Sequence, residues 1–111
     1  MSTNKIISYG KAVIETEIFG AKKLYKTINS DFAKVIDKLS KIKGKVIITG
    51  VGKSGHIASK ISSTMSSTGT LSQYCSPTDM SHGDLGIITK NDAIIIISNS
   101  GKSEEFKSLL D

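Results

Sequence analysis

Two short runs rich in glycine and serine are the residues of this 111-residue chain best suited to bind an anion. The first is Gly50-Val51-Gly52-Lys53-Ser54-Gly55, and the second is Ser98-Asn99-Ser100-Gly101-Lys102-Ser103. Each run follows an apolar segment typical of a strand and precedes a segment with helical periodicity. Such a turn directs backbone N–H groups and the positive end of a helix dipole at one point. Both runs therefore predict phosphate binding.

The first run also matches the letters of the GxGxxG fingerprint found in dinucleotide-binding folds. That fingerprint needs an acidic residue about 20 residues further on, at the end of the next strand, to hold a ribose. Residues 71–75 contain no carboxylate. A P-loop is disfavoured even more, because Ile47 stands where a P-loop requires a glycine, five residues before Gly52. A small and highly anionic ligand suits Lys53 better than a nicotinamide dinucleotide does.

The second run has a simpler explanation as a helix N-terminus. Ser100 or Ser103 would cap the helix, and Glu104 and Glu105 would complement its dipole. Capping accounts for one serine and one acidic residue. It does not account for three serines and a glycine at the carboxyl end of a buried strand, which is where ligands gather in open α/β sheets.

The elements that position these runs follow from the spacing of apolar residues. Residues 4–28 have the periodicity of a helix that Gly10 and Gly20 weaken. A second helix follows the N-cap sequence Asn29-Ser30-Asp31 and ends at Gly44. The sequence therefore predicts a helical segment over residues 1–43, ahead of a domain that occupies residues 44–111.

Short strands alternate with helices after Gly44. The expected strands are 45–49, 71–75 and 92–97, the expected helices are 53–67 and 103–110, and residues 76–86 are expected to form a polar loop. The β-branched run at 92–97 should be buried on both faces. This alternation predicts a parallel sheet between helices, an incomplete three-layer α/β/α sandwich preceded by two N-terminal helices.

Composition excludes several other classes of protein. Cys75 is alone, so the chain can form neither an intrachain disulfide nor a thiolate zinc cage, and a reducing cytoplasm is expected. No apolar run approaches the roughly 20 residues of a membrane span. Residues 1–45 hold ten lysines and four acidic residues. The chain has no arginine to read guanine and no aromatic strip for stacking, so a solvated helical face is favoured over nucleic-acid binding.

The second run, read as Ser98-x-Ser100-Gly101-x-Ser103-x-Glu105, resembles the signature of the sugar isomerase (SIS) domain, whose sheet is flavodoxin-like. Three further strings resemble the arabinose 5-phosphate isomerase branch of that family: Gly50–Ile57, Ser67–Thr70 and His82-Gly83-Asp84-Leu85-Gly86. The resemblance covers residues from about 30 to 111. It implies interconversion of ribulose 5-phosphate and arabinose 5-phosphate, which feeds synthesis of the lipopolysaccharide sugar Kdo.

The resemblance also implies roles for individual residues. Glu105 would act as the base, Lys53 would stabilise the oxyanion or hold phosphate, and His82 would contact substrate. The residues expected to hold the phosphate or line the sugar site are Gly52, Ser54, Gly69, Thr70, Ser98, Ser100, Gly101 and Ser103. The resemblance also implies that His82 can bind zinc, but one imidazole with one nearby aspartate falls short of the usual three ligands. We therefore expect no required cofactor.

Two departures from the family pattern are evident, since Ser76 replaces a usual histidine and Lys102 a common glutamate. The family's second glutamate and histidine, its last two strands and its paired CBS domains lie beyond residue 111. We therefore expect an N-terminal part of the enzyme with little or no activity alone. In the full-length family member the helices before Gly44 would pack on a partner subunit. A phosphosugar-sensing module without catalysis and a remnant of a degraded gene remain as alternatives.

Overall fold

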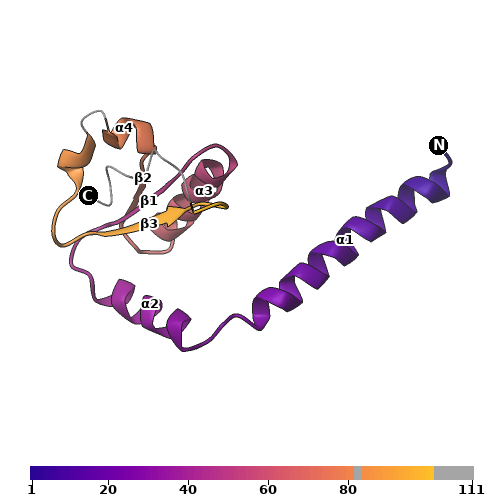
Figure 1. The fold of residues 1–111 in the computed structure, drawn as a ribbon, viewed down its shortest axis with the longest axis horizontal. Coiled ribbons are helices and arrows are strands. Elements are labelled where there is room, and N and C mark those ends of the chain that lie inside the picture. The colour runs from indigo at the N-terminus through magenta and orange to yellow at the C-terminus, as the bar shows by residue number, and fades with distance from the viewer. Residues whose placement is uncertain (82–83, 102–111) are drawn as a thin grey trace. The chain divides into compact units, whose positions relative to one another are not determined.

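The computed structural model describes residues 1–81 and 84–101 of the chain (Figure 1). It divides into two compact units, residues 1–37 and residues 38–111. The helices are α1 (Thr3–Tyr25), α2 (Ser30–Lys41), α3 (Lys53–Ser67), α4 (Pro77–Ser81) and the short 3-10 helix η1 (Asp84–Ile87). The strands are β1 (Val46–Gly50), β2 (Ser72–Tyr74) and β3 (Ala93–Ile97).

The N-terminal helices form where the sequence predicts them. α1 is one continuous helix of 23 residues, so neither of its glycines interrupts it. Ser2 caps it, since the serine hydroxyl accepts a hydrogen bond from the Lys5 backbone N–H at 3.2 Å. The amide oxygen of Asn29 caps α2 by accepting from the Asp31 N–H at 3.0 Å. Neither helix buries a residue.

The three strands form a parallel sheet in the order β2-β1-β3. β1 pairs with β2 from Val46 opposite Ser72, and with β3 from Val46 opposite Ala93 to Gly50 opposite Ile97. From β1 the chain thus passes to β2 on one side, and it later crosses over to form β3 on the other side of β1. This is the strand order with which flavodoxin-like sheets begin, and it confirms the predicted parallel α/β class.

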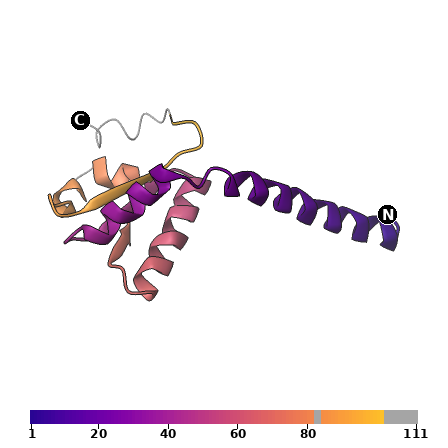
Figure 2. The same ribbon diagram turned by 90° about the horizontal axis from the view of Figure 1, so that it is seen from below.

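Helices cover both faces of this sheet (Figure 2). On one face Val46 and Ile48 pack with Ala58 of α3, and Leu39 and Ile42 pack against the same cluster. On the other face Ile47 packs with Cys75 and with Met80 of α4, and Ile87 and Ile88 pack against that cluster. All five residues of β1 are buried, because successive side chains of a central strand enter opposite cores. The three-layer α/β/α prediction is confirmed.

The prediction of a polar loop over residues 76–86 is wrong. The hydroxyl of Ser76 accepts from the Asp79 N–H at 3.1 Å, and Pro77 takes the first position of α4. The single turn buries Met80 completely, which a loop on the surface would not do. η1 follows it.

The prediction for the third strand is wrong in one respect. Ile94 of β3 is 36% exposed, because β3 pairs only with β1 among the described residues and so lacks the cover of a central strand. The helix predicted over 103–110 lies outside the described residues.

A partly buried ion pair fixes the amino-terminal edge of the sheet. The ammonium of Lys45 lies 2.9 Å from a carboxylate oxygen of Asp92, whose side chain is 2% exposed, and it donates to the Ile87 carbonyl at 2.7 Å. The backbone N–H groups of Lys45 and Thr89 each donate to Asp92 at 2.8 Å. These hydrogen bonds, the Lys45 backbone bond above all, hold the pKa of Asp92 well below its usual range.

The same edge requires a residue without a side chain at position 44. A Cβ atom on Gly44 would overlap the Asp92 carboxylate. The Gly44 N–H donates to the Asn91 carbonyl at 2.9 Å, so the two segments run in direct contact. The segment after η1 is therefore tied to the start of β1 by main-chain and side-chain bonds together.

Candidate functional site

The two predicted turns leave neighbouring strands at the same edge of the sheet. Gly50 and Ile97 form the last pair of the β1–β3 ladder, so residues 51–55 and 98–101 both begin one residue past it. Adjacent strands lie about 4.8 Å apart. Since β2 and β3 lie on opposite sides of β1, this is also the point where the strand order reverses. The structure thus brings the Lys53 turn and the Ser98 turn together.

The first turn presents unpaired backbone donors. Gly52 has φ 59° and ψ −126°, a conformation that favours glycine, and it precedes α3 without a capping side chain. The first intrahelical bond runs from His56 N–H to the Gly52 carbonyl at 3.2 Å. The N–H groups of residues 53–55 have no partner among the described residues. They form the kind of donor set that binds an anion at a helix N-terminus.

The charges around this turn also favour an anion. The first turn of α3 holds no acidic residue, whereas the first turn of α2 holds Asp31. The helix dipole of α3 is therefore not neutralised by a side chain. Lys53 is exposed at this end and adds a full positive charge, and Ser54 next to it is half-buried.

A close approach of backbone to backbone supports the turn. A Cβ atom on Gly55 would lie 2.7 Å from the Gly50 carbonyl oxygen and 3.0 Å from the Tyr74 hydroxyl oxygen. A Cβ atom on Gly50 would lie 2.8 Å from the Ser54 carbonyl. The first turn of α3 therefore packs directly on the end of β1. Tyr74 was not predicted as a site residue from the sequence, although its place at the end of a strand could have indicated it.

Gly55→Ala is expected to destabilise the domain by about 1–3 kcal/mol, because the new methyl group meets backbone that cannot move aside. Urea denaturation of the whole chain measures it. Gly10→Ala in α1 is the matched control, since nothing lies within 4 Å of its Cβ position. The control should gain roughly 0.5–1 kcal/mol from helix propensity. A Gly55→Ala variant as stable as the wild type would show that α3 does not pack this closely on β1.

The second turn is closed by a serine. The Ser98 hydroxyl accepts a hydrogen bond from the Gly101 N–H at 2.9 Å, and Gly101 has φ 69°. A hydroxyl that accepts one hydrogen bond still has its own proton to donate. Ser98 is half-buried, while Ser100 and Gly101 are exposed. The turn thus offers a hydroxyl donor beside the N-terminus of α3.

Gly69 and Thr70 lie elsewhere in the fold. Gly69 follows α3 with φ 101°, and the Leu71 carbonyl just beyond accepts from the Val46 N–H at 2.9 Å. These two residues therefore lie at the amino-terminal edge, roughly 13 Å along β1 from the two turns. The physical reason is that α3 carries the chain back across the sheet before β2 begins. The structure does not bring the predicted pair into one site with Gly52.

Three predicted site residues, His82, Ser103 and Glu105, lie outside the described residues. Within residues 1–81 and 84–101, no group of three histidine, cysteine or acidic residues is placed to hold a metal ion. The zinc prediction for His82 stays a prediction. No helix in the described part of the chain is both long enough and apolar enough to span a membrane.

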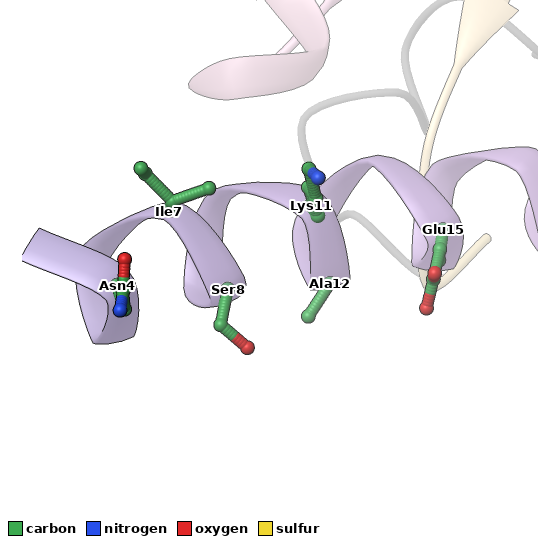
Figure 3. A pocket seen from close by; sticks show the side chains of 6 residues that line it. All are labelled: Asn4, Ile7, Ser8, Lys11, Ala12 and Glu15. Atoms are coloured by element: carbon green, nitrogen blue, oxygen red, sulfur yellow. The ribbon is translucent and has the colours of Figure 1, made fainter.

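A shallow groove of about 410 Å³ lies along α1 (Figure 3). Its lining residues are Asn4, Ile7, Ser8, Lys11, Ala12 and Glu15. All six come from one helix, so no second element forms an opposing wall. This groove lacks the enclosure of a small-molecule site.

The sheet order and the two turns at its switch point define an α/β domain of the flavodoxin-like kind. Residues 38–111 match the sequence profile of the SIS domain, and the chain therefore belongs to the SIS domain family. This result confirms the resemblance seen in the serine turn.

Curated relatives include enzymes. The chain is 45% identical over 101 residues to the arabinose 5-phosphate isomerase KdsD of Yersinia pestis, a match that covers 91% of the chain and 31% of the relative. It is 42% identical over its whole length to an uncharacterized protein of Rickettsia prowazekii, of which it covers 35%. The chain thus spans about a third of the length of these relatives.

A solved structure gives the same fold. The Escherichia coli CFT073 protein c3406, determined in complex with arabinose 5-phosphate, superposes with a TM-score of 0.92 at 39% identity. The match covers 99% of this chain and 58% of that one.

Proposed function

We propose that this chain is the phosphosugar-binding part of an isomerase similar to arabinose 5-phosphate isomerase. The observation that carries the proposal is the meeting of the Lys53 turn and the Ser98 turn at the β1–β3 switch point. The match to KdsD enzymes and the likeness to a protein bound to arabinose 5-phosphate support this ligand class. The free N–H groups of α3 suit the phosphate, and Ser54 and Ser98 supply hydroxyl donors.

The proposed reaction is an aldose–ketose isomerisation. A base removes a proton from one carbon of the sugar, an enediol forms, and the proton returns to the neighbouring carbon. No electrons leave the substrate, so the reaction needs no redox cofactor. Glu105 is the proposed base, Lys53 stabilises the developing oxyanion, and His82 contacts the sugar. These three roles rest on the resemblance to the family.

We further propose that residues 1–111 alone bind the ligand but turn it over little or not at all, because the family's second glutamate and histidine lie beyond residue 111. In the full-length enzyme the product would serve Kdo synthesis in the cytoplasm. The apolar side chains exposed on α1, Val13 and Phe19 among them, support packing of this helix on another subunit there.

Calorimetry and a coupled turnover assay on the purified chain test this function. We expect saturable binding of arabinose 5-phosphate and no measurable conversion to ribulose 5-phosphate. Arabinose without phosphate should not bind, because the phosphate supplies the charge that the α3 turn recognises. Robust conversion would contradict the proposed incompleteness. Failure to bind arabinose 5-phosphate would contradict the function itself.

A further inference from the structure

Thr49 is a buried threonine whose hydroxyl lacks a hydrogen-bond partner among the described residues. The residue is fully buried near the end of β1, and the Gly50–Gly55 turn begins with the next residue. A buried polar atom without a partner is uncommon in folded proteins and calls for an explanation. Neither the fold nor the proposed reaction has used this group.

The Thr49 hydroxyl lies in an apolar layer, next to the edge of the sheet from which the two turns leave. Thr49 pairs with Ile96 of β3 and follows Ile47 by two residues, so it faces the same side of the sheet as Ile47. On that side Ile47 packs with Cys75 and Met80. Ser98 follows Ile96 by two residues on the neighbouring strand. The hydroxyl therefore belongs to the last residue before the Gly50–Gly55 turn, and it lies on the face of the sheet that Ile96 and Ser98 share.

A buried hydroxyl without a partner is expected to lower the stability of the free protein. Valine has nearly the same shape and would fill the same space without an unpaired oxygen. A residue that is unfavourable for stability and lies next to a proposed ligand site indicates a role in function. Because the hydroxyl oxygen has no accessible surface, a ligand cannot touch it directly in this structure. Any influence on the ligand must pass through a neighbouring turn, and the Ser98–Gly101 turn lies on the same face as Thr49.

We propose that Thr49 is a positioning residue for the phosphosugar, a role that rests on the proposed function. Its hydroxyl gains a hydrogen-bond partner in the Ser98–Gly101 turn, which follows β3 on the face that Thr49 shares with Ile96, when the ligand draws that turn into its bound position. Because this hydrogen bond forms only in the complex, it contributes to the free energy of binding. Losing one such bond should weaken binding about 3- to 10-fold.

Thr49→Val and Thr49→Ser separate this role from a structural one. Each variant is measured as the whole chain, for its melting temperature without ligand and for its calorimetric affinity for arabinose 5-phosphate. Thr49→Val should melt above the wild type and bind about 3- to 10-fold more weakly. Thr49→Ser keeps the hydroxyl, so it should bind like the wild type while melting lower for lack of the methyl group. Thr16→Val, the same change on exposed α1, should leave affinity unchanged.

Two results would overturn the role of Thr49. A Thr49→Val variant that binds like the wild type would show that the hydroxyl is only an unpaired group. One that melts below the wild type would show that the hydroxyl already has a partner in the free protein. Failure of the unchanged chain to bind arabinose 5-phosphate is a separate result. It would overturn the proposed function and, with it, this role.

Discussion

Asp92→Asn is expected to destabilise the domain strongly at neutral pH and progressively less as the solution becomes acidic. The substitution removes the charge that Lys45 and two backbone N–H groups hold in place, and it leaves the Lys45 ammonium facing an amide. Because the pKa of Asp92 is lowered in the folded state, its charge contributes full stability above the ordinary carboxyl value of about 3.9. That contribution is lost as the pH falls below this value toward the lower folded-state pKa.

Urea midpoints of the wild type and of Asp92→Asn, measured from neutral pH to below about 3.9, check this result. The difference between the two proteins should be largest at neutral pH and should shrink in acid. Asp31→Asn is the matched control, because the Asp31 side chain is exposed and pairs with the exposed Lys34 at 3.7 Å. A difference for Asp92→Asn that stays constant with pH would show that the effect comes from packing and not from charge.

The sequence alone predicts the sheet and its ligand edge well, for a physical reason. A buried central strand shows as a continuous apolar run, and a glycine turn into a helix shows as a break in that run followed by a new periodicity. Residues 45–49 and 53–67 were predicted on this basis, and β1 and α3 lie within one residue of those bounds.

The errors arise where a short element depends on one or two local bonds. α4 has one large apolar side chain, Met80, and residues 76–86 are otherwise rich in turn formers. The sequence Ser76-Pro77-x-Asp79 carries a helix-start signal of cap, proline and acidic residue, which could have found it. Ile94 looked like a residue of a central strand because an apolar run does not tell how many neighbours a strand has.

Two features lay beyond any local pattern. Lys45 and Asp92 are separated by 47 positions, and each reads as an ordinary surface charge until the topology brings them together. Thr49 reads as a strand residue of good β-propensity, and its unpaired hydroxyl appears only once the packing on both faces of β1 is known. Gly69 and Thr70 were placed in the site by a motif match alone. Such a match cannot tell which edge of the sheet a residue occupies.

Lys53→Met is expected to weaken binding of arabinose 5-phosphate by about 10- to 100-fold, the loss of one hydrogen bond to a charged group. Lys53 stands in the first turn of α3, where the unpaired N–H groups of residues 53–55 and the helix dipole already favour an anion. Its ammonium adds the only full charge in that turn, since no acidic residue accompanies it. Calorimetric titration at two salt concentrations measures both the affinity and its electrostatic part.

Lys60→Met is the control that isolates position from net charge. Lys60 is an exposed residue of the same helix, about 10 Å further along its axis, and its replacement changes the charge of the chain equally. At physiological salt a charge at that distance is largely screened, so the control should bind nearly as tightly as the wild type. Equal losses in the two variants would mean that the ligand responds to the overall charge of the domain. A loss confined to Lys53→Met, smaller at high salt, would place the phosphate at the N-terminus of α3.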